Sequence, residues 1–468
     1  MPSAEEVLLE KRSPTGRQWE VQAPGLFTDL YELRMAEAYL SEGMSGEAVF
    51  TLSVRKLPPQ RNYLIACGLD SLIERLESFR FGQEHIEYLR EVGGFGEAFL
   101  DYLEGFRFGG DVQAAPEGTV LFPHEPILEV AAPLPEAQLL ETLVLNQIHH
   151  QTLIASKASR IVTAAADRPV VDFGARRMHG LDAAVAGARA AFVAGVASTS
   201  NVLAGYVHGI PVAGTMAHSY VQAHESELAA FRTYASRYPE TVLLVDTYDT
   251  LEGVHRVIDL ARELGPEFHI SAVRLDSGDL AALATRSRQL LDAAGLHAVK
   301  IFASGGLDEH EIDRLLQAEA PIDAFGVGTH MGVSSDAPLL DMTYKLVEYE
   351  GKPKTKLSPG KLVLPGRKQV FRLEENDRAI GDVIATANED CPGRPLLRPA
   401  MRGGRRAGGR GSPIDARARA AGELASMSTG LRSLETRHDL YAVSISDRLQ
   451  GKLDALRQSL APAGRQSD

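Results

Sequence analysis

The 468-residue sequence predicts an α/β protein: an irregular α/β barrel of about seven strands, preceded by an N-terminal α+β domain. Three observations support this fold class. Short apolar runs alternate with helical patterns through the middle of the chain, as in parallel βα units. Polar or glycine-rich residues follow most of these runs, where a barrel carries its functional loops. The alternation stops after residue 340, where hairpin patterns begin. A doubly wound parallel sheet is the alternative architecture.

These patterns divide the chain into four segments. Residues 1–25 are polar and are expected to be frayed. Residues 26–133 form the N-terminal α+β domain, and residues 134–340 form the barrel, which carries the catalytic groups. Residues 341–468 return to pack on the N-terminal domain and end in helices.

The N-terminal domain is expected to combine helices with short strands. Thr28 or Asp29 can cap the first helix. The expected elements are this capped helix within 26–40, a strand at 47–58, a helix at 61–79, strands broken by glycine and proline at 106–133, and, after the domain, a long helix at 135–165.

The barrel strands are the apolar runs that end in polar or glycine-rich tips. They are expected at 169–177, 190–201, 211–219, 241–249, 270–279, 299–306 and 323–330. Helical stretches separate most of them. The return segment is expected to contain hairpins at 343–385, a basic stretch at 394–411, and helices at 412–427 and 444–461.

Composition and charge exclude several classes of protein. The net charge of −13 makes binding of nucleic acid over a broad surface improbable. We find no apolar run long enough to cross a bilayer, so no membrane association is expected. Cys67 and Cys391 are too few for a disulfide framework or a zinc cluster. These features are typical of a reduced cytoplasmic enzyme.

The first tips carry an aromatic ring, arginines and a histidine. Phe173, Arg176 and Arg177 follow the first barrel strand, where the aromatic ring and one guanidinium can sandwich a flat ring and the second arginine can hold a phosphate. A core phenylalanine and two surface arginines are the alternative. Thr215 and His218 follow another strand, and His218 is either structural or a group that contacts or accepts phosphate. The spacing of His218 and His224 does not suit a shared metal site.

The later tips carry carboxylates, one arginine and glycines. Asp246 and Asp276 can stabilise a developing cation or hold Mg²⁺ through water, although Asp276 could instead cap a helix. Arg274 can bind a carboxylate in a bidentate pair. The last two loops favour phosphate binding, with glycines that let main-chain N–H groups approach an anion. Their candidate residues are Gly305, Gly306, Gly328 and Thr329.

At these tips the sequence resembles nicotinate phosphoribosyltransferase, from about residue 25 to residue 440. The matching segments are TDLYEL, DFGARR, STSNVLAG, PVAGTMAHS, VDTYD, VRLDSGDL, ASGGLDE, GVGTH and RPAMRGGRR. The resemblance implies an N-terminal α+β domain packed on an irregular barrel, and a homodimer with shared active sites. It implies a cytoplasmic enzyme that converts nicotinate and phosphoribosyl pyrophosphate into nicotinate mononucleotide and pyrophosphate, coupled to ATP hydrolysis, with Mg²⁺ as cofactor and no direct protein ligand to the metal.

The resemblance also implies a role for each candidate residue. Tyr31 and Phe173 would pack on the nicotinate ring, and Tyr31, in the N-terminal domain, would complete a neighbouring subunit's site. Thr215 and Arg274 would hold the nicotinate carboxylate, and His218 would be the histidine that ATP phosphorylates. The remaining residues would bind the sugar and its phosphates: Arg176, Asp246 and Asp276 at the ribose and pyrophosphate, and Gly305, Gly306, Gly328 and Thr329 at the 5′-phosphate.

Two other readings remain open at this point. Nicotinamide-using relatives carry an aspartate that accepts from the carboxamide, whereas Ser200 stands at the corresponding position here, which favours the acid as substrate. Quinolinate-using relatives are shorter and fit less well. The other alternative is a catalytically silent relative that senses nucleotides.

Overall fold

The computed structural model describes residues 24–92, 94–358, 362–437 and 441–461, so most of the segment expected to be frayed lies outside the described residues. The chain divides into two compact units. The described part of the first unit is Lys157–Asp336, and the second unit joins Gly16–Ser156 to Ala337–Asp468. Helix α7, Glu141–Ala164, begins in the second unit and ends in the first.

The first unit contains a six-stranded, wholly parallel sheet in the order β7-β6-β11-β10-β9-β8. Its strands are β6 (Val170–Asp172), β7 (Ser198–Thr199), β8 (Val242–Leu244), β9 (Ala272–Leu275), β10 (Lys300–Ala303) and β11 (Ala324–Val327). Along the sequence, β6 is the first strand of this sheet and β11 is the last, and these two strands pair directly. This arrangement confirms a curled parallel α/β sheet, while the described residues give six strands rather than seven.

Two of the expected strands are much shorter than predicted. The run at 190–201 begins inside helix α8 (Leu181–Val193), because its alanines suit a helix, and only Ser198–Thr199 pair as a strand. The run at 211–219 makes a single parallel bridge between Val212 and Thr199. Pro211 has no N–H to donate to a longer ladder, and α10 already begins at His218.

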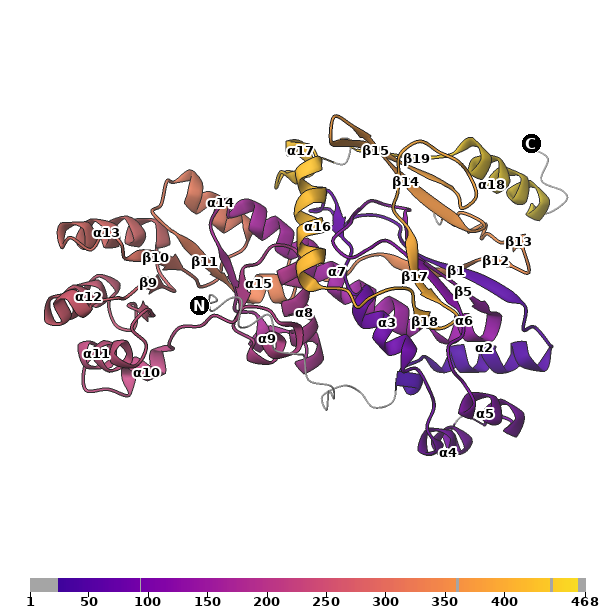
Figure 1. Cartoon of the computed structure of the whole chain (residues 1–468), viewed down its shortest axis with the longest axis horizontal. Coiled ribbons are helices and arrows are strands. Elements are labelled where there is room, and N and C mark those ends of the chain that lie inside the picture. The colour runs from indigo at the N-terminus through magenta and orange to yellow at the C-terminus, as the bar shows by residue number, and fades with distance from the viewer. Residues whose placement is uncertain (1–23, 93, 359–361, 438–440, 462–468) are drawn as a thin grey trace. The chain divides into compact units, whose positions relative to one another are not determined.

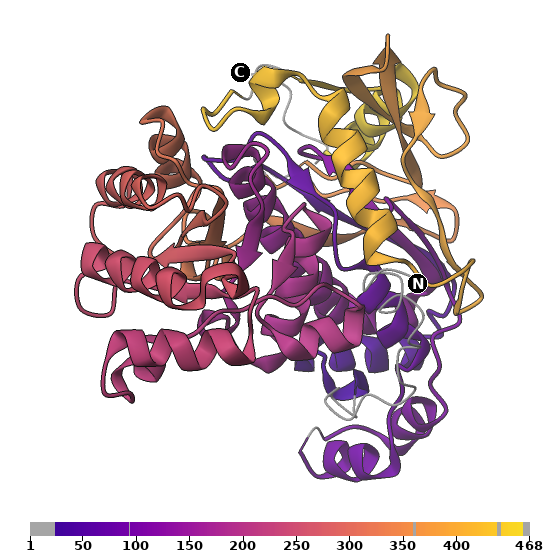
Figure 2. The same ribbon diagram turned by 60° about the vertical axis from the view of Figure 1, so that its left-hand side comes forward.

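Helices cover the outside of this sheet, and α11, α12 and α13 stack side by side beyond β8, β9 and β10 (Figures 1 and 2). The helices are α8, α9 (Val202–His208), α10 (His218–Gln222), α11 (Glu227–Arg237), α12 (Thr250–Leu264), α13 (Leu280–Ala293), α14 (Glu309–Gln317) and α15 (Thr329–Gly332), with short 3₁₀ turns at Ala175–Arg177 and Gly265–Glu267. Asp249 and Asp279 cap α12 and α13 with their side chains. Asp246 and Asp276 are not caps.

The second unit is built around a seven-stranded sheet in the order β13-β12-β1-β5-β3-β17-β18. Its strands are β1 (Glu47–Val54), β3 (Asp111–Ala114), β5 (Pro126–Pro133), β12 (Met342–Tyr349), β13 (Lys352–Pro353), β17 (Arg398–Arg402) and β18 (Arg405–Arg406). The three strands from the N-terminal part, β1, β5 and β3, lie together at its centre, and strands from the C-terminal part flank them on both sides, because β1 pairs with β12 and β3 pairs with β17. Buried aliphatic and aromatic side chains of this unit form an extended core cluster.

The remaining elements of the second unit surround this sheet. The helices are the 3₁₀ turn Pro24–Leu26, α2 (Leu30–Ser41), α3 (Leu69–Glu77), α4 (Gln83–Val92), α5 (Glu97–Glu104), α6 (Leu134–Leu139), α16 (Pro413–Ser426), α17 (Thr429–Arg432) and α18 (Asp447–Leu460). The strands are β2 (Leu64–Ile65) paired with β4 (Val120–Leu121), and the sheet β16 (Arg394–Pro395), β14 (Lys368–Glu375), β15 (Arg378–Thr386) and β19 (Ala442–Ile445). In the described parts of the chain, no helix has the length and apolar character that a bilayer span requires.

Three helix expectations differ from the structure. The expected helix at 61–79 begins only at Leu69, since Gly68 adopts a φ of 101° that ends the preceding extended segment. The long helix at 135–165 is interrupted at Leu140 and forms α6 and α7. Asp29 occupies the N-cap position of α2 without a side-chain cap bond.

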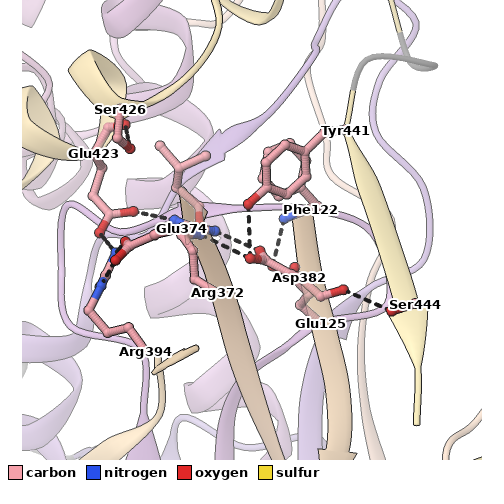
Figure 3. Close-up of polar contacts among 11 residues, drawn as sticks. Phe122, Glu125, Arg372, Glu374, Asp382, Arg394, Glu423, Ser426, Tyr441 and Ser444 are labelled. Atoms are coloured by element: carbon pink, nitrogen blue, oxygen red, sulfur yellow. Dashed lines mark hydrogen bonds and ion pairs between the residues drawn. The ribbon is translucent and has the colours of Figure 1, made fainter. Parts of the chain in front are cut away.

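A buried ionic network connects the smaller sheet to α16 (Figure 3). The Arg372 side chain is 0% exposed and makes a two-pronged ion pair with Asp382, through Nε (3.0 Å) and Nη2 (2.7 Å). Its Nη1 donates to Glu423 on α16, and Nη2 also donates to the main-chain oxygen of Val120. Tyr441 adds a hydrogen bond to Asp382. The Arg372 guanidinium thus links its own strand, β14, to β15, β4 and α16.

Candidate active site

Arg274 is the centre of a polar cluster at the carboxyl end of β9, and its side chain is only 11% exposed. Its Nε donates to Ser304 Oγ (2.8 Å) at the end of β10. Nη1 donates to Thr215 Oγ1 (2.9 Å) and, more weakly, to the main-chain oxygen of Met216 (3.4 Å). Nη2 donates to Asp276 Oδ1 (2.7 Å). The guanidinium therefore joins three loops that lie far apart in the sequence.

Asp276 is the carboxylate of this cluster. Burial opposes its ionisation, but the hydrogen bond from Ser304 and the positive charge of Arg274 outweigh burial and hold the pKa of Asp276 below its usual range. The side chain is therefore anionic at neutral pH. A fixed negative charge at this position can stabilise a cationic reacting centre.

His218 is the first residue of α10 and lies beside Asp276. Its Nδ1 is 3.2 Å from Thr247 Oγ1, and its Nε2 is 3.8 Å from Asp276 Oδ2. The side chain is 42% exposed, so the ring is accessible from solvent. An exposed histidine whose Nδ1 faces a hydroxyl can act as a nucleophile through Nε2.

Phe173 supplies an aromatic face to the same cluster. The Cζ atom of Arg274 lies 5.2 Å from the centroid of the Phe173 ring. The Phe302 ring packs against Phe173 at a centroid distance of 5.9 Å. Asp172, which is buried, accepts the Gly174 N–H and the Thr199 hydroxyl and so fixes the turn that carries Phe173. An aromatic ring beside a guanidinium suits a flat, anionic ligand.

Asp246 connects the tips of β8 and β9. Its Oδ2 accepts the main-chain N–H of Asp276 (3.1 Å) and the hydroxyl of Ser277 (2.6 Å). Its Oδ1 is buried and hydrogen-bonds to no other described group. This oxygen is a free acceptor at the edge of the cluster. The described residues contain no group of three or more side chains able to hold a metal ion.

The glycine-rich loops lie at the ends of β10 and β11. Gly305 has a φ of 89°, and a Cβ there would stand 1.8 Å from the main-chain oxygen of Asp276, so this loop accommodates only glycine. The N–H groups of Gly305 and Gly306 donate to no other described residue. Gly328 lies against the main chain of Phe173, with Thr329 next to it at the start of α15. Free N–H groups in such loops can receive an anion.

Two predicted site residues do not join the Arg274 cluster through any described contact. Arg176 lies in the 3₁₀ turn that follows β6, and its side chain is exposed. Tyr31 lies on α2 of the second unit. Both assignments stay predictions.

The cluster includes residues that the sequence alone did not assign to the site. Ser304 bridges Arg274 and Asp276, and Thr247 holds His218. Both are polar residues inside otherwise assigned tips, which is the only signal that could have identified them. Glu227, at the start of α11, is also buried, and burial raises its pKa to about 7. Nothing in the local sequence distinguishes it from an ordinary first-turn acid.

Comparisons with known proteins agree on one family. Residues 26–149 match the model of the nicotinate phosphoribosyltransferase N-terminal domain, and residues 169–369 match that of the nicotinate phosphoribosyltransferase family. A nicotinate phosphoribosyltransferase of Mycobacterium tuberculosis is 55% identical over 435 residues, covering 93% of this chain and 94% of the relative. That of Bacillus subtilis is 44% identical over 383 residues, covering 80% and 78%.

Two solved structures of related enzymes share the fold of this chain. Human nicotinic acid phosphoribosyltransferase superposes with a TM-score of 0.82 at 29% identity, covering 92% of this chain and 99% of the human chain. The nicotinate-nucleotide pyrophosphorylase of Pyrococcus furiosus superposes with a TM-score of 0.71 at 28% identity, covering 89% and 99%.

Proposed function

The chain belongs to the nicotinate phosphoribosyltransferase family, and from this premise we propose how its residues divide the reaction between nicotinate and phosphoribosyl pyrophosphate. The enzyme class follows from the relatives, and it argues against the alternative of a catalytically silent protein. The division of roles rests on one observation, the cluster in which Arg274 meets Thr215, Ser304 and Asp276.

Arg274 and Thr215 bind the carboxylate of nicotinate, and Phe173 packs on its ring. Arginine has five N–H donors, and those of Arg274 already make four hydrogen bonds, one of them the long 3.4 Å bond to Met216. A substrate carboxylate would take the unused N–H and replace the Met216 contact. Asp276 keeps the guanidinium oriented meanwhile. Ser200 adds no negative charge against the carboxylate, in keeping with the acid as substrate and against the alternative of nicotinamide.

The glycine-rich loops and carboxylates bind the phosphoribosyl group. Gly305, Gly306, Gly328 and Thr329 receive the 5′-phosphate through main-chain N–H groups and the threonine hydroxyl, and Arg176 binds pyrophosphate. The ring nitrogen of nicotinate attacks the anomeric carbon as the bond to pyrophosphate breaks. Asp246 and Asp276 stabilise the positive charge that develops on the sugar.

Asp246 also fits a place near Mg²⁺. Its buried Oδ1 has no described partner and can accept a hydrogen bond from a metal-bound water. The chemistry that Mg²⁺ supplies when bound is neutralisation of negative charge on the leaving pyrophosphate.

His218 couples the reaction to ATP. With Nδ1 directed at Thr247, the accessible Nε2 attacks the γ-phosphorus of ATP, and the bond to the ADP oxygen breaks so that ADP leaves. Water later cleaves the phosphorus–nitrogen bond and releases phosphate, which returns His218 to its starting state.

We expect His218→Ala to abolish the response of the transfer rate to ATP while slow ATP-independent transfer continues. The reason is that the ring nitrogen accepts phosphate but takes no part in forming the glycosidic bond. The measurement is product formation from nicotinate and from nicotinamide, each with and without ATP. His224→Ala is the matched control, since His224 bonds only to the main-chain oxygen of Tyr220. A His218→Ala enzyme that remains ATP-stimulated would exclude His218 as the phosphate acceptor.

A homodimer with shared sites is the proposed assembly. Tyr31 is 46% exposed on α2, and Phe27, Leu30 and Met35 are exposed beside it, which suits a surface that meets a second copy. Cys67 and Cys391 form no described disulfide, in keeping with work in a reducing cytoplasm.

Shared sites predict complementation between two inactive variants. Tyr31→Ala and Arg274→Ala chains, mixed under conditions that allow subunit exchange, should regain activity, because one of the two sites in a mixed dimer receives both intact residues. Transferase activity against mixing ratio measures this. Mixtures that stay as inactive as the separate variants would argue against a shared site.

A further inference from the structure

A cavity of about 340 Å³ lies in the second unit, and none of the residues assigned to the reaction lines it. The β17–β18 hairpin, helix α3 and the first turns of α16 surround it; α16 is the long yellow helix of Figures 1 and 2. The turn at Gly118 allows α16 to approach closely, since a Cβ there would stand 2.2 Å from the main-chain oxygen of Ala416. The cavity is therefore enclosed by elements from both ends of the chain.

The cavity has an apolar floor and a rim of arginines. Its floor includes the buried side chains of Ile73, Ala114, Ala400 and Ala416. Its rim carries the guanidinium groups of Arg398, Arg406, Arg410 and Arg419. An apolar body and an anionic head group would match these two parts of the surface.

Two of the four arginines hold the hairpin in place. Arg406 pairs with the buried carboxylate of Asp70, which also accepts the N–H of Gly411 (3.0 Å). Arg410 lies 3.7 Å from Asp70 and pairs with Glu74. Glu117, the second buried acid of the lining, accepts the N–H of Gly68 (2.7 Å). These acids are occupied by structural donors and do not compete for the other arginines.

The remaining two arginines have no acidic partner among the described residues. The Arg398 side chain is exposed and makes no described hydrogen bond or ion pair, and the Arg419 side chain donates only to the main-chain oxygen of Glu117 (2.7 Å). Asp415 is the one exposed acid of the lining. The lining thus carries four arginines against three acids, Asp70, Glu117 and Asp415, in a protein whose net charge is −13.

We propose that this cavity binds a phosphorylated small molecule of the nucleoside monophosphate class. Guanidinium groups bind phosphate oxygens through paired N–H donors, so the arginines of the rim favour a phosphate as the anionic head group of the ligand. The apolar floor offers a surface for the flat face of a base. The volume lies at the lower end of the range for ligand pockets, which suits a mononucleotide better than a dinucleotide.

The probes are adenosine 5′-monophosphate, adenosine and inorganic phosphate, each measured on the full chain by equilibrium dialysis. We expect the monophosphate to bind, inorganic phosphate to bind more weakly, and adenosine not to bind detectably. Arg398→Gln combined with Arg419→Gln should weaken monophosphate binding at least about tenfold. Arg402→Gln is the matched control, because Arg402 lies exposed on the same strand outside the cavity. Arg274→Ala should leave this binding unchanged, which separates the cavity from the transferase site.

Asp415→Asn gives a second test that does not depend on the stability of the double variant. It removes negative charge from the rim and should tighten monophosphate binding. Equal affinity across the wild type, the double variant and Asp415→Asn would overturn the proposal, as would adenosine binding as tightly as its monophosphate. Equal affinity for inorganic phosphate and the monophosphate would overturn the assignment of a nucleoside body.

Discussion

Replacing Arg274 by alanine is expected to weaken the use of nicotinate by about 2–5 kcal/mol, the usual cost of truncating one partner of a buried, hydrogen-bonded charge pair. The guanidinium is nearly buried, and its loss removes the donor for the substrate carboxylate and frees Asp276 and Thr215 from their fixed positions. The effect should therefore appear in the Michaelis constant for nicotinate and in kcat/KM.

Steady-state kinetics with nicotinate varied at saturating phosphoribosyl pyrophosphate measure the effect. Arg274→Lys keeps the charge but loses the two-pronged geometry, and we expect it to recover only part of the activity. Arg286→Ala, an exposed arginine on α13, is the control for loss of a positive charge in the same unit. An unchanged Michaelis constant for nicotinate in Arg274→Ala would remove Arg274 from the carboxylate site.

Replacing Arg372 by methionine is expected to lower the free energy of unfolding by about 3–5 kcal/mol, because Asp382 and Glu423 would remain buried without their cation (Figure 3). Methionine fills much of the same volume, so the loss reflects charge more than a cavity. Urea or thermal unfolding, followed by circular dichroism, measures the change. Arg378→Met, an exposed site on β15, is the control and should change little.

The loss should also depend on pH. Glu125 is buried beside Asp382; burial and the neighbouring carboxylate raise its pKa, whereas Arg372 lowers it. A carboxyl group with a raised folded-state pKa binds more protons folded than unfolded, so its effect on stability becomes less favourable as pH rises above the usual glutamate pKa. Without Arg372 the pKa of Glu125 would rise further, so the free energy of unfolding would fall more as the pH rises. The destabilisation by Arg372→Met should be larger at pH 8 than at pH 5, and the reverse order would contradict this account.

The sequence predicted the parts of the molecule that depend on local patterns. Apolar runs ending in polar tips predicted the parallel sheet, and with it the meeting of Thr215, Arg274 and Asp276 at one edge. The sequence could not tell which aspartate caps a helix. Asp279 and Asp276 follow the same strand, yet Asp279 caps α13, whereas Asp276 binds Arg274.

Features that depend on long-range pairing could not be predicted. Whether the run at 211–219 forms a strand depends on what lies beside it, and only the Val212 bridge forms. Arg372 reads as one more basic residue in a hairpin, since its partner Glu423 is supplied by a distant helix. The cavity beside α16 likewise arises from segments that the sequence separates by hundreds of residues.

The pairing of β1 with β12 and of β3 with β17 has a consequence during synthesis on the ribosome. The amino-terminal strands emerge first, yet two of their neighbours in the sheet are translated only after the whole parallel sheet of the first unit. Until then β1 lacks its β12 neighbour and exposes unpaired main-chain groups. The nascent amino-terminal segment is therefore the part of this polypeptide with the greatest need for chaperone protection.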